Sequence, residues 1–328
     1  MIALDANGAD SGPATVAEGG RRAGARLLLF GPAAVLGGDV IDAPEAISGD
    51  EEPVRAVRAR PDASIVQAAR AVGDGRAQAL VSAGPTGAAL AASVLHIKRL
   101  HGVHRPAIAA LVPVPGRPVL LLDAGANVEV RPEHLVQFAH MGAAFMSAVH
   151  GVERPRVALL SVGEEASKGT PDVIEAHARL AGGTLDFVGN VEGGDLTAGA
   201  ADVVVTDGFT GNVALKVMEG TAKTVVGAVR DAVRSSAMSS LGGLLIRRQV
   251  GALRERLDPN SEGGAILLGL RATVVIAHGG SSAGGVANAV RLAQRAVDER
   301  MVERTAEALE AGGVMRSGPA ASVANRHE

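Results

Sequence analysis

Seven glycine-rich segments carry the polar groups of this sequence that are best suited to bind a small ligand. Most of them follow a short apolar run and precede a helical pattern, where the first N–H groups of the helix lack partners and favour an anion. The segments are Leu4–Pro13, Ser82–Ala88, Leu122–Val128, Ser161–Thr170, Gly189–Asp195, Thr206–Lys216 and Gly263–Ser282. Each alone is compatible with an ordinary turn, but together they favour an enzyme that handles an anion such as phosphate.

Two lysines are informative because lysine occurs at only four positions, whereas arginine is plentiful. Lys168 lies among glycines just before a helical pattern, and Lys216 follows Asn212 by one helical turn on the same face. A lysine ammonium is a compact charge that can hold phosphate. We therefore expect Asn212, the amides around Gly211 and Lys216 to hold an anion. Lys168 is either a second such cation or a solvated loop residue.

The remaining candidate residues offer hydrogen bonds. Gly84 and Thr86 lie in the segment SAGPTG, whose amides can cradle a phosphate or a thioester-linked group, although no lysine follows as in a Walker motif. Asp10 belongs either to a ligand loop or to an ordinary turn. Asn127 can orient an acyl oxygen or cap its own turn. His278 follows an apolar run directly and is a candidate acid/base or a hydrogen-bond donor to phosphate.

The elements that must position these groups alternate between strand and helix. Short, non-alternating apolar runs are typical of strands covered on both faces. The expected strands are Ile2–Leu4, Arg26–Phe30, Ala79–Ser82, Ile108–Val112, Val119–Leu122, Val157–Ser161, Leu185–Val188, Val203–Thr206 and Thr273–Ala277. The expected helices are Pro13–Gly24, Asp62–Val72, Thr86–Leu100, Pro132–Val149, Thr170–Ala181, Asn212–Ser235 and Ala283–Ala311. This order predicts a parallel sheet between helices, with ligands beyond the carboxyl ends of the strands.

Composition excludes several classes of protein. The chain has 328 residues, enough for one large α/β unit or about two domains. A net charge of −3 argues against nucleic-acid binding through global basic charge, and the absence of tryptophan and tyrosine argues against a base-stacking surface. With no cysteine, thiol nucleophiles, disulfides and cysteine-ligated metals are ruled out. We see no signal peptide or membrane span, so we expect a cytoplasmic protein.

In this order, the segments resemble the bacterial phosphate acyltransferases of the PlsX family. The resemblance extends from Ile2 to about Ala293, and the stretches Asp123–Phe138 and Asp207–Gly220 are its most specific parts. Pro85 departs from the family pattern, which usually has asparagine there, and leaves one backbone donor fewer. The matching stretches are IALDANGAD, ALVSAGPTGAAL, LLDAGANVEVRPEHLVQFAHMG, ALLSVGEEASKG, FVGNVEGGD, ADVVVTDGFTGNVALKVMEG, and GGAILLG followed by VVIAHGGSS.

The resemblance implies a reaction and a setting. Such enzymes transfer a long-chain acyl group from acyl carrier protein to inorganic phosphate, and a glycerol-3-phosphate acyltransferase consumes the acyl phosphate in phospholipid synthesis. The implied fold is a three-layer α/β/α sandwich with a mainly parallel sheet, like that of phosphate acetyltransferases and isocitrate or isopropylmalate dehydrogenases. The family implies a homodimer that needs no metal or other cofactor and associates peripherally with the inner face of the cell membrane.

The resemblance also suggests roles for the candidate residues. Phosphate itself is the nucleophile, so the enzyme needs only to position it and to stabilise an oxyanion. Lys168 is expected to hold the phosphate charge and Asn212 to orient phosphate or the oxyanion, with His278 as a weaker catalytic candidate. The expected phosphate or acyl contacts are Asp10, Gly84, Thr86, Asn127, Gly211 and Lys216.

A helical hairpin at about residues 212–257 is expected to protrude from a single catalytic unit, residues 1–311, which a flexible tail, residues 312–328, follows. The hairpin's expected membrane contacts are Leu241, Leu244, Leu245 and Ile246, which lie close to several arginines. Apolar residues beside arginines can dock at an anionic membrane surface. The same segment also fits a dimer contact with solvated arginines, or a surface that attracts the acidic carrier protein.

Three other functions were weighed. A phosphate acetyl- or butyryltransferase would use acyl-CoA on a similar fold. A non-catalytic membrane scaffold for lipid synthesis is disfavoured because Lys168 and Asn212 are both present. A dehydrogenase of the isopropylmalate type is disfavoured because the sequence shows no clustered set of aspartates for its metal.

Overall fold

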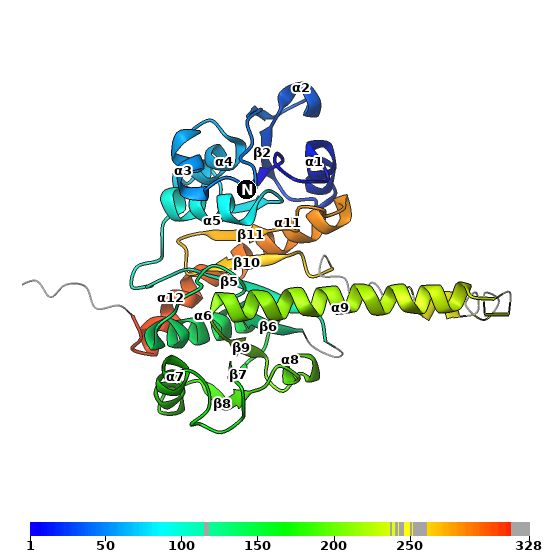
Figure 1. The fold of residues 1–328 in the computed structure, drawn as a ribbon. Coiled ribbons are helices and arrows are strands. Elements are labelled where there is room, and N and C mark those ends of the chain that lie inside the picture. The colour runs from blue at the N-terminus through cyan, green and yellow to red at the C-terminus, as the bar shows by residue number, and fades with distance from the viewer. Residues whose placement is uncertain are drawn as a thin grey trace, which may run out of the picture.

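A computed structural model describes residues 1–114, 118–236, 238–239, 242, 246–249, 251 and 261–315. Within these residues, eleven strands form one sheet in the order β3-β2-β1-β4-β11-β10-β5-β6-β9-β7-β8 (Figure 1). The strands are β1 Ile2–Asp5, β2 Leu27–Gly31, β3 Ile41–Asp42, β4 Ala79–Ser82, β5 Ala107–Val112, β6 Val119–Leu122, β7 Arg156–Leu160, β8 Asp186–Val191, β9 Val203–Val205, β10 Ala265–Leu268 and β11 Thr273–Ile276. The expected α/β class with a mainly parallel sheet is confirmed.

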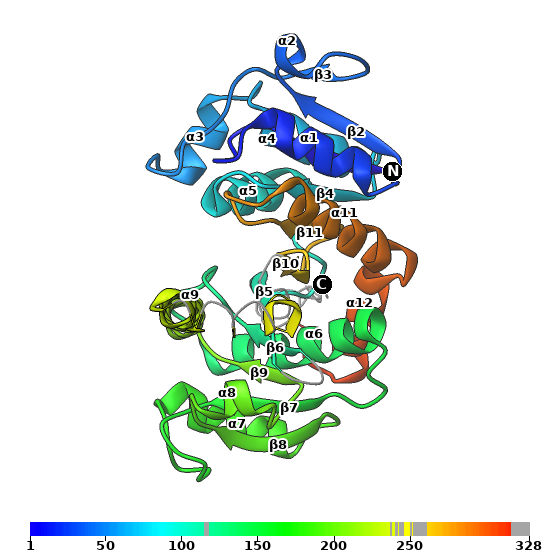
Figure 2. The same ribbon diagram turned by 90° about the vertical axis from the view of Figure 1, so that its right-hand side faces the viewer.

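Helices cover both faces of the sheet, which makes three layers (Figure 2). One face carries α1 Pro13–Arg22, α6 Pro132–His150, α7 Pro171–Ala181, α11 Ala283–Asp298 and α12 Met301–Ala311. The other face carries α3 Pro53–Ala59, α4 Ser64–Gly73, α5 Thr86–Ala92 with the π turn η1 Ser93–Ile97, α8 Asp195–Ala198 and α9 Gly208–Arg234. The short helix α2 Ala33–Leu36 follows β2. Each face of the sheet is therefore buried, as the continuous apolar strands predict.

The sheet contains a reversal of strand direction that the sequence did not reveal. Strands β1, β2, β3, β4 and β11 are parallel, but β10 is antiparallel to both β11 and β5, and β5 is antiparallel to β6. The strands β6, β7, β8 and β9 are parallel to one another. The sheet thus consists of two parallel halves of opposite direction, so the carboxyl ends of the two halves lie at opposite edges.

Several expected elements differ in detail. The expected helix at 86–100 is interrupted by the π turn η1, and the expected helix at 283–311 divides into α11 and α12 at Arg300, which has a left-handed φ of 53°. Helix α9 begins at Gly208, four residues before the expected start, because the side chain of Asp207 caps it. Strands β3 and β10 and helix α3 had not been expected.

Helix α9 runs along the middle of the molecule and then out beyond the rest of the described fold (Figure 1). The segment after it is described only in part. Leu241, Leu244 and Leu245, three of the expected membrane contacts, lie outside the described residues, whereas Ile246 is helical and 47% exposed. No helix in the described part of the chain is long and apolar enough to cross a membrane.

The start of the expected tail is packed against the fold. Gly312 lies so close to the ring of His140 on α6 that a Cβ there would come within 2.3 Å of it. Gln137 of α6 donates to the carbonyl of Val314 at 2.7 Å. Residues 316–328 lie outside the described residues.

Candidate functional site

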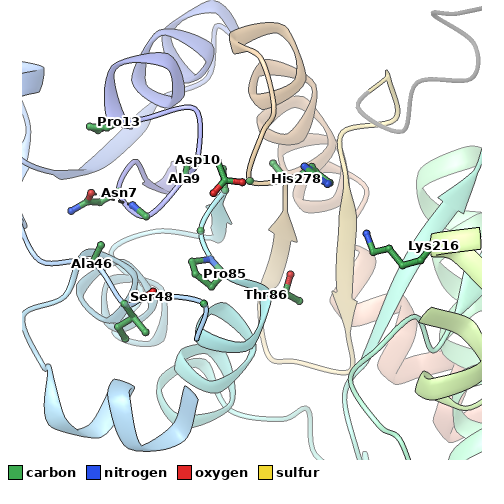
Figure 3. Close-up of a pocket in the computed structure, with 17 residues that line it drawn as sticks. Asn7, Ala9, Asp10, Pro13, Ala46, Ser48, Pro85, Thr86, Lys216 and His278 are labelled. Carbon is green, nitrogen blue, oxygen red and sulfur yellow. Dashed lines mark hydrogen bonds between the residues drawn. The ribbon is translucent and has the colours of Figure 1, made fainter. Parts of the chain in front are cut away.

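A cavity of about 680 Å³ opens where four loops of the first half of the sheet face α9 (Figure 3). We call it the polar cavity, because charged and polar side chains and bare backbone line much of it. Three of the loops follow β1, β4 and β11, the fourth is the loop after β3 with residues 46–49, and α9 contributes Lys216 from the opposite side. The lining residues used below are Asn7, Asp10, Gly84, Thr86, Lys216 and His278. The loops at the carboxyl ends of these three parallel strands, which are expected to bind a ligand, therefore line one cavity.

A buried carboxylate holds two of these loops from beneath. Asp5 is the last residue of β1 and is fully covered. Its Oδ2 accepts the hydroxyl of Ser82 at 2.7 Å, and its Oδ1 accepts the backbone N–H of Asn7 at 3.2 Å. The Ser82 hydroxyl oxygen in turn accepts the N–H of Gly84 at 3.0 Å. Asp5 thus fixes the loop after β1 and the loop after β4 relative to each other.

The third loop is joined to the first by the backbone. The N–H of Ser11 donates to the carbonyl of Gly279 at 3.2 Å, which places Asp10 beside the turn that carries His278 (Figure 3). The N–H of Gly280 donates to Nδ1 of His278 at 3.2 Å. Neutral His278 therefore carries its proton on Nε2, so its free ring nitrogen is a donor.

Lys216 faces His278 and Thr86 across the cavity (Figure 3). Its ammonium lies 3.0 Å from the carboxylate of Glu219, one turn further along α9. The Lys216 side chain is 56% exposed and that of Glu219 only 14%. The cation is thus held at the cavity wall by a neighbour while it stays accessible to an anion.

The start of α5 supplies unpaired backbone donors at the same place. The first helical hydrogen bond of α5 runs from Ala89 N–H to the carbonyl of Pro85, so the N–H groups of Thr86 and Gly87 precede it. Pro85 stands at the N-cap and has no N–H of its own. Helix-terminal amides and a lysine are together able to hold a phosphate dianion.

A second buried carboxylate organises the other half of the site. Asp123 follows β6, and its Oδ1 accepts N–H groups from Ile108 and Ala126, both at 3.0 Å. Its Oδ2 accepts the backbone N–H of Asn127 at 2.6 Å and the side-chain amide at 2.8 Å. The N–H of Gly208 then donates to the carbonyl of Asn127 at 2.7 Å. Asp123 thereby fixes the loop on which α9 begins.

Asn127 and Gly211 belong to this support. The Asn127 amide also donates to the carbonyl of Pro106 at 2.8 Å, and the side chain is buried. A Cβ on Gly211 would lie 2.0 Å from the carbonyl oxygen of Asp123, so the first turn of α9 rests directly on that backbone. Neither residue lines the polar cavity.

A second cavity, of about 350 Å³, adjoins the first. The two share Thr86, Lys216, Ala277 and His278. Beyond these residues the lining is mainly apolar and includes Leu90, Ile108, Ala110, Leu215, Ala265 and Ile276, and we call it the apolar cavity. Asn212 also lines it, so this expected catalytic residue shares a cavity with His278 although they come from opposite halves of the fold.

The structure brings together most of the expected residues, but not Lys168. Asp10, Gly84, Thr86, Lys216 and His278 surround the polar cavity. Lys168 is exposed in the loop between β7 and α7 and lines neither cavity. Its role in holding phosphate stays a prediction.

Sequence reasoning missed the supporting carboxylates and the apolar cavity. Asp5 and Asp123 both end a buried strand and precede glycines, which is a signal that a buried acceptor holds the following turn. The apolar cavity had no comparable signal, because alanines on separate strands form its floor only after the sheet is assembled. Among the described residues, no group of three or more histidine, aspartate or glutamate side chains is arranged to hold a metal ion.

Burial raises the pKa of Asp5 from 3.8 to about 6, although hydrogen bonds from Ser64 and Ser82 oppose the rise. Between these values the folded chain keeps a proton that the unfolded chain has lost, so this group's contribution to stability falls as pH rises from 4 to 7. Two pKa units correspond to about 3 kcal/mol. We expect Asp5→Asn to remove this pH dependence. Between pH 4 and 7, the free energy of unfolding in urea should therefore rise in the variant relative to the parent by up to this amount. A stability difference that does not vary with pH would contradict the assignment.

Comparisons with known proteins show which sequences this chain resembles. The sequence model of the family described as "Fatty acid synthesis protein" matches residues 1–304. A protein of Heliobacterium modesticaldum named phosphate acyltransferase is 44% identical over 318 residues, covering 92% of this chain and 95% of its own. A phosphate acyltransferase of Thermobifida fusca is 42% identical over 323 residues, covering 93% of this chain and 89% of its own.

Solved structures share the fold at low sequence identity. A phosphotransacetylase of Streptococcus pyogenes aligns with a TM-score of 0.57 and 17% identity, over 92% of this chain and 94% of that one. A 4-hydroxythreonine-4-phosphate dehydrogenase of Klebsiella pneumoniae aligns with a TM-score of 0.50 and 16% identity, over 90% and 98%. The fold is thus of the expected type, in which phosphotransacetylases and dehydrogenases share one architecture.

Proposed function

We propose, from the premise that the chain belongs to the phosphate acyltransferase family of fatty acid synthesis proteins, that it transfers a long-chain acyl group from acyl carrier protein to inorganic phosphate. The enzyme is a phosphate acyltransferase; the carrier-protein donor and the chain length are the parts that we propose. The observation that carries the proposal is the polar cavity, where the ammonium of Lys216, the donor nitrogen of His278 and the first N–H groups of α5 surround one space.

The reaction that this space can perform is an acyl substitution. An oxygen of hydrogen phosphate attacks the thioester carbonyl carbon, the C–S bond breaks, and an acyl phosphate forms. The proton of hydrogen phosphate ends on the departing thiolate, so nothing is oxidised or reduced. No enzyme nucleophile is needed, which agrees with a chain that has no cysteine.

The residues divide this work between binding and electrostatics. Lys216 and the N–H groups of Thr86 and Gly87 bind the phosphate dianion. They also position it close to the carbonyl carbon of the thioester. The Nε2–H of His278 donates to the carbonyl oxygen as it becomes negative. Asp10, which lines the same cavity, accepts the proton of hydrogen phosphate as the new bond forms and passes it to the departing thiolate.

The surroundings of the site extend the proposal. Asn212 orients the acyl oxygen from the first turn of α9. A homodimer and a peripheral contact with an anionic membrane surface are supported by the extended α9 and by Ile246 beside Arg247 and Arg248. We propose that residues 1–311 act as one catalytic unit in the cytoplasm and that a glycerol-3-phosphate acyltransferase consumes the product.

The test is direct formation of acyl phosphate. Purified protein is mixed with palmitoyl-acyl carrier protein and phosphate, and the product is trapped with hydroxylamine as the hydroxamate. We expect hydroxamate that depends on phosphate, one carrier thiol released per product, and little reaction with palmitoyl-CoA. Product from short acyl-CoA alone would favour an acetyl- or butyryltransferase instead, and no product from any donor would refute the catalytic proposal.

A further inference from the structure

We propose that the apolar cavity holds the acyl chain of the thioester donor, and that Ala110 and Ala265 on its floor set how long a chain the enzyme accepts. This inference rests on the proposed function, because it assigns a place to part of the same substrate. It follows from the position of the cavity, from its lining and from the small residues that create it.

The floor of the cavity crosses three adjacent strands on one face of the sheet. Ile276 of β11 pairs with Ala265 of β10, and the register of β10 against β5 brings Ala265 beside Ala110. All three side chains line the cavity. Since neighbouring strands lie about 4.8 Å apart, Ala110 is about 10 Å from Ile276 across the sheet. The floor is therefore a strip that leads away from His278.

Beyond the junction with the polar cavity, the walls are apolar except for Asn212 and Glu219 of α9. Leu90 of α5 stands on one side and Leu215 of α9 on the other, and both are half-buried. The cavity lies between these two helices and the sheet, where Ala110 and Ile276 are buried beneath it. A linear hydrocarbon is the ligand that such a channel of methyl groups stabilises, by about 0.8 kcal/mol per buried methylene.

The junction with the polar cavity fixes the direction of the substrate. Thr86, Lys216 and His278 line both cavities, so a carbonyl placed between them lies at the end of each. Phosphate then occupies the polar side and the acyl chain extends over the apolar side. This arrangement puts the scissile carbonyl carbon where the donor groups converge.

Small residues keep the strip open. Alanine at 110 and at 265, together with Gly125, leaves the space that larger side chains would fill. Ala110 lies two strands away from Ile276, which directly precedes Ala277 and His278, so a larger residue there meets a distal part of a long chain. A butyryl chain is too short to cross two strand spacings and does not reach it.

The test compares chain lengths in cavity-filling variants. We expect Ala110→Leu to lower kcat/KM for palmitoyl-acyl carrier protein by about tenfold or more and to leave the butyryl donor unchanged. Leu215→Phe narrows the cavity from a half-buried position and should lower the same value. It serves as the second variant in case Ala110→Leu folds poorly. Ala228→Leu, on the exposed part of α9, is the matched control and should change neither value.

Binding is measured separately from turnover, by displacement of a fluorescent fatty acid with palmitate. We expect Ala110→Leu to bind palmitate more weakly and the control to bind it normally. This result would support the inference even if no acyl phosphate formed, because the absence of acyl phosphate would refute only the proposed reaction. An equal loss for all donors would instead place the pantetheine arm in this cavity and overturn the inference. Unchanged chain preference and unchanged palmitate binding would overturn it as well.

Discussion

Replacing Lys216 by methionine is expected to lower kcat/KM for phosphate by roughly a hundredfold, the effect of removing one preorganised group that stabilises charge in a transition state. Methionine keeps the length and apolar stem of lysine, so the change removes chiefly the ammonium. Lys216 lines both cavities and faces His278 and Thr86 across the polar one (Figure 3). It is the lysine that the structure places nearest to the proposed reaction.

The loss of the Lys216 ammonium also leaves the charge of its ion-pair partner, Glu219, unbalanced near the phosphate. The Glu219 carboxylate lies 3.0 Å from the ammonium and is largely covered. Glu219 lines the adjoining apolar cavity, so without the cation its unneutralised charge repels a dianion that enters the polar cavity. We therefore expect Lys216→Met to raise KM for phosphate as well as to lower kcat. The double variant Lys216→Met with Glu219→Gln should have a lower KM for phosphate than Lys216→Met alone.

Two other lysines make the comparison specific. Lys223 lies further along α9, exposed, and lines neither cavity, so Lys223→Met should retain normal turnover. Lys168→Met tests the expectation from the sequence that Lys168 holds the phosphate charge. Near-normal turnover in Lys216→Met, together with a large loss in Lys168→Met, would transfer the phosphate contact to the loop after β7.

The sequence predicted the ligand loops well because they depend on local signals. A strand buried on both faces, followed by Asx and glycine and then by a helix start, is recognisable from a few residues. The segments that contain Asp10, Gly84 and His278 follow this pattern, and the structure brings all three to one cavity. Their convergence was expected from the shared direction of β1, β4 and β11.

The direction of the other strands could not be predicted in this way. Strands β5, β6 and β10 read as ordinary buried apolar runs, and whether such a run pairs parallel or antiparallel depends on distant partners. The apolar cavity lies over these strands, between α5 and α9. The apolar cavity is thus a property of the topology, which no single segment encodes.

The hydrogen-bond partners of individual residues could not be predicted from the sequence either. Asn127 looked like a ligand for an acyl oxygen, but its amide is committed to Asp123 and to the carbonyl of Pro106. The amides around Gly211 are expected from the sequence to orient phosphate, and the structure adds that Gly211 permits a close approach of backbones. In both cases the residue type was compatible with either role, and only the neighbours that the fold supplies decide between them.

The largest effect on stability is expected from Gly211→Ala. The added Cβ would lie 2.0 Å from the carbonyl oxygen of Asp123, a separation that real Cβ atoms essentially never show. The obstacle is backbone, and Asp123 is held in place by several hydrogen bonds, so the start of α9 must move instead. We expect a loss of about 3 kcal/mol in the free energy of unfolding, at the upper end for overpacking.

The same displacement should reduce activity, because the first turns of α9 carry Asn212 and Lys216. Alanine is the better helix former by about 1 kcal/mol, so propensity alone predicts that both glycine replacements in α9 stabilise the protein. Gly220→Ala provides the matched control, since nothing lies within 4 Å of its added Cβ, and it should be neutral or stabilising with normal turnover. Urea unfolding and kcat/KM of the two variants separate these effects. Equal stability of Gly211→Ala and Gly220→Ala would mean that α9 is not seated on the Asp123 loop, and that the position of Lys216 does not depend on this contact.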